Sequence, residues 1–219
     1  MAHDLTRPIN TIQLLSSILK KELNGEKFDE IKRYFRIIDD TCNSSIDLIT
    51  RLVNNELLLS TKVDLVKDRI DIVEKINNLV EVYKWSHAEI GKTFSVISSE
   101  NKIFIVADEV KLLQAVNNLI ANSIKFTREN GHISITINNT DSTLLIIVKD
   151  DGVGIPVHLH PFLFDKFTRA ARVGLKGEKT VGLGMSITKT IVELHGGKIW
   201  FDSEENKGSA FYISIPCTE

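Results

Sequence analysis

The sequence is poor in cysteine, in net charge and in long apolar runs, and each shortage excludes a class of protein. The two cysteines, Cys42 and Cys217, lie far apart without metal-ligand spacing, which argues against a disulfide framework or zinc site and favours a reducing compartment. A net charge of −2 gives no reason to expect nucleic acid or an acidic membrane as a partner. No run of about 18 apolar residues is present, so we expect no membrane contact within this chain.

Signal peptides, repeats and low-complexity tracts are also absent from the sequence. The first turn carries His3, Asp4 and Arg7, unlike the apolar core of a signal peptide. We therefore expect a cytoplasmic fragment whose upstream sensing part lies outside the sequence. Hydrophobic residues at 42% and charged residues at 26% are typical of a globular protein, and 219 residues suit one large domain or two small ones.

Two helical patterns begin the chain. The first, from Leu5 to Leu23, repeats apolar residues at helical spacing and ends at the Asn24-Gly25 turn signal. The second, from Phe28 to Leu52, alternates steps of three and four, the a/d seam of a heptad repeat. Two such helices bury little by themselves, so we predict that residues 1–60 form a hairpin that completes a four-helix bundle with a second copy. Docking onto the rest of the chain, without a dimer, is the alternative.

From residue 61 onward, short β-rich runs alternate with helical patterns. We predict helices near residues 72–83, 110–120 and 183–195, and a long loop with a short helix over 152–181. The expected strands are 93–97, 102–106, 133–137, 144–148, 198–201 and 210–215. The expected apolar stripe of the middle helix is Val110, Leu113, Val116, Leu119 and Ile120. The pattern predicts an α+β sandwich, one mixed sheet with helices on one face.

Polar residues of the middle helix form the first of four spaced motifs. Asn118, Asn122 and Lys125 fall at i, i+4 and i+7, so all three point the same way. An amide oxygen is a suitable ligand for Mg²⁺, and a lysine one turn on can reach the phosphates that the metal bridges. The alternative interpretation is a solvated polar face.

The second motif, Asp150-Asp-Gly152-Val-Gly154, follows an apolar strand. A carboxylate at a strand end can accept a hydrogen bond from an exocyclic amine such as N6 of adenine, and the glycines allow the backbone to approach a flat ring. An ordinary turn is the alternative, since Asp-Gly is a common turn dipeptide.

The remaining motifs lie in and after the long loop. Leu163, Phe164 and Phe167 are apolar residues in a polar stretch and are expected to anchor the loop to the core. Basic residues give the loop positive charge that suits a triphosphate or simply solvent; they are Lys166, Arg169, Arg172, Lys176 and Lys179. Gly182-Leu-Gly184 then opens a helix whose first amides can bind phosphate.

In this order the motifs resemble the ATP-binding domain shared by sensor histidine kinases, gyrase, mismatch-repair ATPases and heat-shock chaperones. They are similar to its N box, first glycine box, F box and second glycine box, and Gly208-Ser209-Ala-Phe resembles a closing element whose hydroxyl supports the adenine aspartate. The resemblance implies ATP and Mg²⁺ as cofactors, with Asn122 as metal ligand. The residues it implies for nucleotide binding are Asn118, Asn122, Lys125, Asp150, Gly152, Gly154, Phe167, Arg169, Gly182, Leu183, Gly184 and Ser209.

The start of the chain distinguishes the kinases from the other branches. His3-Asp-Leu-Thr-Arg-Pro8-Ile resembles the H box of sensor histidine kinases, which implies that His3 accepts the phosphoryl group. An imidazole is largely neutral and nucleophilic at pH 7, and Asp4 would fix its tautomer and accept the developing charge. The resemblance implies a receiver domain of a response regulator as partner, a homodimer through the first helices, and residues 61–219 as the ATP-binding domain.

Two departures from the family pattern affect these expectations. Arg7 stands four residues after His3, where kinases that also dephosphorylate their partner carry Thr or Asn, so phosphatase activity is not implied. The second glycine box reads Thr180-Val-Gly-Leu-Gly and lacks its first glycine, which stiffens the hinge of the loop.

Three hypotheses follow for the function. The first is a histidine autokinase; the second is a non-kinase ATPase of the same superfamily, whose first helices serve a partner; the third is a degenerate nucleotide-binding module. Replacing His3 separates the first two, because only the autokinase loses its phosphoprotein while retaining ATP. Asn122, Lys125 and Asp150 argue against the third hypothesis.

Overall fold

A computed structural model describes residues 64–87, 91–140, 142–166, 172–175 and 182–217, together with Ile38, Ala170 and Gly177. From Leu65 onward the chain forms one compact unit. Apart from Ile38, the predicted helical hairpin of residues 1–60 lies outside the described residues, and the domain boundary near residue 60 stays a prediction. In the described part of the chain, no helix is both long and apolar enough to cross a membrane.

A mixed five-stranded sheet in the order β2-β4-β5-β7-β6 forms one layer of this unit. Four of its strands are antiparallel neighbours, β4 (His132–Thr140), β5 (Thr143–Asp150), β7 (Gly208–Pro216) and β6 (Lys198–Glu204). The edge strand β2 (Thr93–Ser98) pairs in parallel with β4. The predicted mixed sheet is therefore confirmed.

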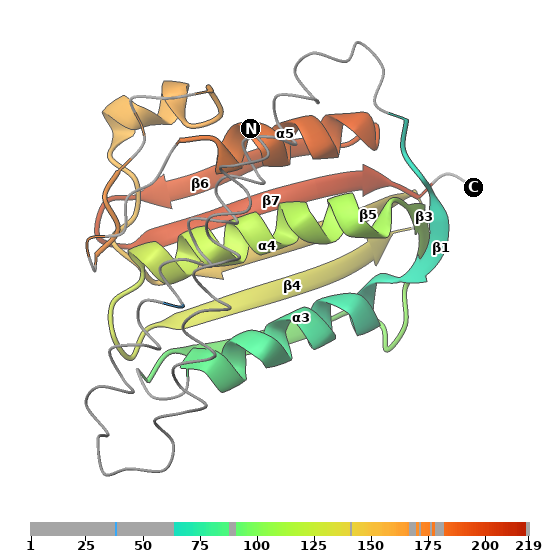
Figure 1. Ribbon diagram of the computed structural model, residues 1–219, viewed down its shortest axis with the longest axis horizontal. Coiled ribbons are helices and arrows are strands. Elements are labelled where there is room, and N and C mark those ends of the chain that lie inside the picture. The colour runs from blue at the N-terminus through green and yellow to red at the C-terminus, as the bar shows by residue number, and fades with distance from the viewer. Residues whose placement is uncertain are drawn as a thin grey trace. The chain divides into compact units, whose positions relative to one another are not determined.

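Three helices cover one face of this sheet, and α4 lies between α3 and α5 (Figure 1). They are α3 (Ile72–His87), α4 (Glu109–Phe126) and α5 (Gly184–Leu194). Alternate residues of each central strand point at the helices; on β4, Ile133 and Ile135 are fully buried. Burying each such side chain contributes about 1.5–3 kcal/mol, and a one-residue slip would expose them all, so the register is fixed.

A second, two-stranded sheet departs from the expectation of a single sheet. Strand β1 (Asp68–Asp71) pairs antiparallel with β3 (Phe104–Ala107), with Ile70 opposite Ile105 and both buried. The sequence predicts a strand near β3, over residues 102–106, and leaves residues 60–69 open as a linker or a short strand. It does not predict their pairing, because the paired residues lie far apart, by 35 positions for Ile70 and Ile105.

The stripe expected on α4 is wrong at its first position. Val110 is 78% exposed, whereas Leu112 is fully buried. The helix begins at the Asp108 N-cap, so Val110 falls in the first turn on the side away from the sheet. The rest of the buried stripe includes Val116, Leu119 and Ile120, as expected.

The long loop contains the short helix that the sequence predicts, the 3₁₀ helix η2 (Val157–Phe162). After it, Leu163 is buried and the Phe164 ring meets Phe201 edge to face, with the ring centroids 5.8 Å apart. The predicted anchoring of the loop is confirmed for these two residues.

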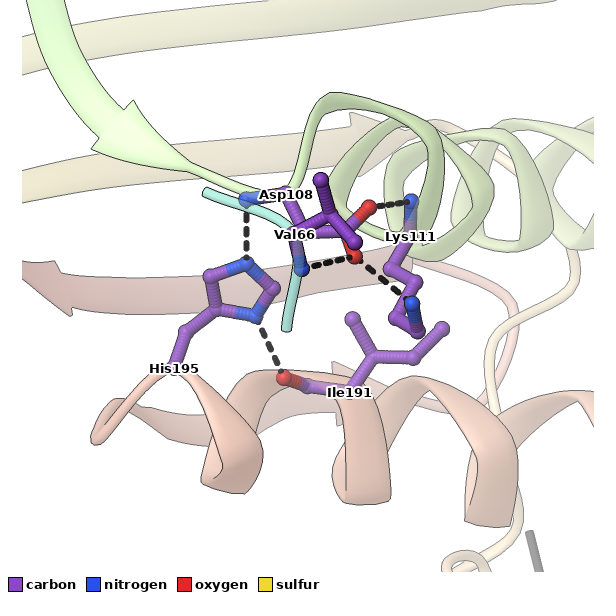
Figure 2. A network of polar contacts seen from close by, with 5 residues as sticks. All are labelled: Val66, Asp108, Lys111, Ile191 and His195. Atoms are coloured by element: carbon purple, nitrogen blue, oxygen red, sulfur yellow. Dashed lines mark hydrogen bonds and ion pairs between the residues drawn. The ribbon is translucent and has the colours of Figure 1, made fainter. Parts of the chain in front are cut away.

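A polar network joins α4, α5 and the start of the unit at the ends of the two helices far from Asn122 and Gly184 (Figure 2). Asp108 caps α4 by accepting from the Lys111 N–H at 3.0 Å, and it also accepts from the Val66 N–H at 3.2 Å and from Lys111 Nζ at 2.6 Å. The Asp108 N–H donates to His195 Nε2 at 3.1 Å, while His195 Nδ1 donates to the Ile191 carbonyl at 2.8 Å. We call these residues (Val66, Asp108, Lys111, Ile191 and His195) the distal network.

Candidate functional site: a buried carboxylate between two helix ends

Asp150 ends strand β5 with its side chain 4% exposed, on the face that the helices cover. Its Oδ1 accepts from the Gly152 N–H at 3.0 Å and from the Ser209 N–H at 3.2 Å. Its Oδ2 accepts from the Ser123 hydroxyl at 3.0 Å. Three neutral donors therefore orient the carboxylate, and all belong to segments that the sheet and α4 hold in place.

Burial raises the pKa of the Asp150 carboxyl above its ordinary value of 3.8. The hydrogen bonds from Gly152, Ser123 and Ser209 oppose that shift, and the neighbouring charge of Asp151 adds to it. A buried acceptor with a raised pKa is unusual in a purely structural role and is a mark of a functional site.

The glycines after Asp150 are required by space and by backbone conformation. A Cβ at Gly152 would lie 2.3 Å from the Phe126 carbonyl oxygen and 2.8 Å from Asp150 Oδ1. Gly154 has φ +64° and a Cβ there would lie 2.0 Å from the Glu204 carbonyl oxygen. A side chain at either position would push the turn away from β6, β7 and α4.

Ser209 supports Asp150 through its backbone rather than through its hydroxyl. Its N–H donates to Asp150 Oδ1, whereas its hydroxyl lies 2.9 Å from the Ser203 hydroxyl. Ser209 therefore lies next to Asp150, as expected. Its hydroxyl contacts Ser203, however, and not Asp150 as the resemblance implies.

Asn118 and Asn122 both face helix α5, as their spacing on α4 predicts. Asn118 Nδ2 lies 3.4 Å from both the Gly184 carbonyl oxygen and Thr188 Oγ1, and Asn122 Nδ2 lies 3.2 Å from the Met185 sulfur. All these contacts are long or involve a weak acceptor, so they hold the amides loosely. The Lys125 carbonyl accepts from the Leu175 N–H at 3.0 Å, which ties the long loop to the last turn of α4.

The orientation of Asn122 fits a magnesium ion. With Nδ2 directed at the Met185 sulfur, the amide oxygen is the atom left for another ligand. Mg²⁺ prefers oxygen ligands, keeps several waters and needs only one or two protein groups beside phosphate. Among the described residues no cluster of three or more His, Cys, Asp or Glu side chains is present, so an amide-and-phosphate site is the arrangement that this donor set supports.

Helix α5 begins beside these amides with an uncapped end. Leu183 precedes the helix and is buried, and no described side chain caps its first N–H groups. Gly182 has φ +74°, and a Cβ at Gly184 would meet no described atom within 4 Å. An open helix N-terminus with unpaired amides is suited to a phosphate.

Four predicted site residues lie outside the described residues. They are His3, Asp4, Phe167 and Arg169. Their roles stay predictions from the sequence.

Three contributors to the site were not predicted as such. Ser123 holds Asp150; Met185 meets Asn122; and the Arg172 guanidinium carbon lies 4.4 Å from the centre of the Phe126 ring. A serine at a buried position of an apolar helix face is a signal that could have indicated Ser123. The other contacts depend on tertiary packing and leave no local pattern.

Comparison with known sequences places this geometry in a family. Residues 107–219 match the family described as histidine kinase-, DNA gyrase B-, and HSP90-like ATPase. The sensor histidine kinase WalK of Bacillus subtilis is 29% identical over the whole chain, which covers 36% of that protein. A sensor protein kinase WalK of Staphylococcus aureus is 30% identical over 99% of the chain, which covers 52% of it. The chain thus spans between about a third and about half of these relatives.

Solved structures agree with the sequence comparison. The catalytic domain of histidine kinase ThkA matches 70% of this chain and 97% of its own, with a TM-score of 0.62 and 29% identity. A structure of ThkA in complex with the response regulator protein TrrA matches 99% of this chain and 60% of its own, with a TM-score of 0.65 and 25% identity. With the family match covering more than half of its length, the chain belongs to the histidine kinase-, DNA gyrase B- and HSP90-like ATPases.

Proposed function

We propose that this chain is the catalytic part of a sensor histidine kinase, which uses ATP and Mg²⁺ to phosphorylate His3 and passes the group to an aspartate of a response regulator. The observation that carries the proposal is the buried Asp150 carboxylate, held by neutral donors between α4 and the glycine turn. That arrangement suits recognition of the adenine amino group, because a buried carboxylate held only by neutral donors has acceptor capacity left for a further N–H group.

The described residues account for nucleotide binding from base to phosphate. Asp150 accepts from the base, and Gly152 and Gly154 allow the backbone to approach it. Asn118 and Asn122 face the start of α5, where the amides of Gly184 and the next residues receive phosphate, and Lys125 lies about one turn further along α4. When bound, Mg²⁺ neutralises charge on the phosphates as the γ-phosphoryl leaves. Asn122 is its proposed protein ligand.

The proposed chemistry is an in-line transfer of the γ-phosphoryl group from an oxygen of ATP to a ring nitrogen of His3. One ring nitrogen of His3 forms a bond to the γ-phosphorus while the bond to the bridging oxygen breaks, and the electron pair leaves with ADP. Asp4 holds the N–H of the other ring nitrogen and stabilises the positive charge that develops. The phosphoryl group then moves to a carboxylate oxygen of the receiver aspartate.

The partner and the assembly are parts of the same proposal. ThkA, which matches nearly the whole of this chain, has been seen with a response regulator protein, and this supports a receiver domain as the acceptor here. The heptad seam from Phe28 to Leu52 supports a homodimer through residues 1–60. The proposed location of this fragment is the cytosol.

The test is incubation with γ-labelled ATP and Mg²⁺, beside the His3→Gln variant. Label that is labile in acid, stable in alkali and present only on the parent protein supports an autokinase with His3 as acceptor. If neither protein is labelled while both bind ATP, the kinase proposal is wrong and a non-kinase ATPase remains. A chain extended upstream by several helical turns repeats the assay with His3 away from a fraying end.

A further inference from the structure

An arginine of the long loop lies against the same groups that we propose to receive the base. The Arg172 guanidinium carbon lies 4.4 Å from the centre of the Phe126 ring, the last residue of α4. Its Nη1 donates to the Gly154 carbonyl oxygen at 2.8 Å. One side chain thus bridges the end of α4 and the second glycine of the turn after Asp150.

The charges around Arg172 include the carboxylate at the centre of the site. Arg172 is half-buried, and burial lowers the pKa of its guanidinium, while the carboxylates of Asp150 and Glu205 oppose that shift. Asp150 is therefore within electrostatic reach of the guanidinium, although its own hydrogen bonds come from neutral groups.

The loop backbone near Arg172 also contacts α4. The Leu175 N–H donates to the Lys125 carbonyl at 3.0 Å, and the Val153 N–H donates to the Phe126 carbonyl at 3.0 Å. Hydrogen bonds therefore join the last turn of α4 to the glycine turn and to residues 172–175 of the loop. The Arg172 side chain contacts both the end of α4 and the glycine turn.

A guanidinium and an adenine ring present similar chemistry to such a group. Both are flat, both stack on an aromatic ring, and both carry N–H donors at their edge. Phe126 supplies the aromatic face, the Gly154 carbonyl supplies an acceptor, and Asp150 supplies the negative charge. A base on this ring with its amino group at Asp150 would need the volume that the guanidinium fills.

We propose that the Arg172 guanidinium occupies the face of Phe126 on which the nucleobase stacks, and that ATP binds by displacing it from this ring. This inference rests on the proposed function, because it assumes that a purine binds at Asp150. Arg172 then holds the glycine turn and the loop together, and it competes with the ligand for the Phe126 ring.

The test is the affinity of the full chain for adenosine, which lacks phosphate, and for ATP with Mg²⁺, measured by calorimetric titration. Arg172→Ala removes the competitor, and we expect it to bind adenosine about threefold to tenfold more tightly than the parent. Arg172→Lys keeps the charge but loses the flat face, and we expect a smaller gain. The matched control is Arg69→Ala, which removes another arginine lying 4.4 Å over a phenylalanine ring, that of Phe104 in the two-stranded sheet. We expect it to leave adenosine affinity unchanged.

The sign of the change decides the proposal. If Arg172→Ala binds adenosine as weakly as the parent or more weakly, Arg172 does not compete with the base and the inference is wrong, even if the parent binds ATP. A loss of ATP affinity with a gain for adenosine supports it, and assigns Arg172 a second contact with phosphate. If Arg172→Ala does not fold, the adenosine affinity of Arg172→Lys decides. Tighter binding than that of the parent supports the proposal, and equal or weaker binding contradicts it. Absence of ATP binding in every variant overturns both this inference and the proposed function.

Discussion

Two aspartates that are equally buried, Asp108 and Asp150, have opposite environments. Each is 4% exposed and each follows or ends a strand beside α4. Burial alone would raise the pKa of both, but at Asp108 the hydrogen bonds from Lys111 and Val66 and the charge of Lys111 hold the pKa below its ordinary value. At Asp150 only neutral groups donate hydrogen bonds, and burial keeps its pKa raised.

The difference separates a carboxylate that stabilises the fold from one that is kept for a ligand. Lys111 and the Val66 N–H compensate the charge of Asp108 inside the distal network, so a ligand would gain no binding energy by adding a further donor there. Asp150 retains a part of its desolvation cost, which a donor from outside can relieve. The same helix, α4, thus begins at a carboxylate that is paired with a lysine and leads to one whose hydrogen bonds come only from neutral groups.

The largest expected effect is a loss of stability on replacing Asp108, the aspartate that stabilises the fold. Asp108→Ala removes the N-cap of α4 and the acceptor for Val66, and it leaves Lys111 without its partner. We expect the free energy of unfolding to fall by about 2–4 kcal/mol, measured by urea denaturation. Asp108→Asn can still cap the helix and should lose less. Equal stability of Asp108→Ala and the parent would contradict the role given to the distal network.

Asp150→Asn tests the other aspartate, and the expected loss is in binding. An amide cannot accept from both Ser123 and a base with the same strength, so we expect ATP affinity to fall about tenfold to a hundredfold, measured by calorimetric titration. The free energy of unfolding at neutral pH should not fall, because the buried charge is removed. The matched control is Asp151→Asn, one residue on and exposed. An equal loss of affinity in the control would argue that net charge, and not the buried acceptor, matters.

Ser123→Ala is expected to have a smaller effect in the same place. It removes the hydroxyl that donates to Asp150 Oδ2 and should weaken ATP binding by about 1 kcal/mol, or about fivefold. Because that hydrogen bond opposes the upward shift, the pKa of Asp150 should rise further, which NMR titration of the carboxyl carbon can follow. A fall in that pKa would show that the hydroxyl does not stabilise the carboxylate.

The smallest effects concern pH, and the two aspartates should give opposite signs. At Asp150 the folded pKa lies above the unfolded one, so the folded state binds more protons and its contribution to stability is lost as pH rises through the folded pKa. At Asp108 the folded pKa is lowered, so the stability it contributes is present above the unfolded pKa and is lost as pH falls through the folded one. We expect Asp108→Asn to lessen acid destabilisation relative to the parent, and Asp150→Asn to increase it, in urea denaturation below pH 6. Changes of the same sign would contradict the comparison.

Local patterns in the sequence predicted the elements well. The spacing of Asn118 and Asn122 placed both on the face that meets α5, and the β-rich runs identified each strand of the large sheet. The family resemblance that these motifs indicated is confirmed by the match to the family model. Helical and strand periods act over a few residues, so a short window of sequence is enough to reveal them.

Contacts between distant residues were not predictable in this way. His195 meets Asp108 across 87 positions, and Ser123 meets Asp150 across 27. A histidine near a helix end and a serine in an apolar stripe give no sign of their partners, because only the packing of α4 on α5 and on β5 brings them together. The unexpected β1–β3 sheet has the same cause, whereas the outward-facing Val110 follows from the start of α4 at the Asp108 N-cap.

The attachment of α5 at the distal network has a consequence for how the domain opens. Both nitrogens of His195 are hydrogen-bonded inside the protein, whereas at the other end of α5 the described side-chain hydrogen bonds to α4 are the long contacts of Asn118 and Asn122. Local unfolding starts where buried contacts are fewest, so backbone amides at the start of α5 should exchange with deuterium sooner than those near Ile191. A nucleotide that bridges the two helices would slow exchange at the start of α5 and leave the protected end unchanged. The same helix would then report ligand binding at one end and global stability at the other.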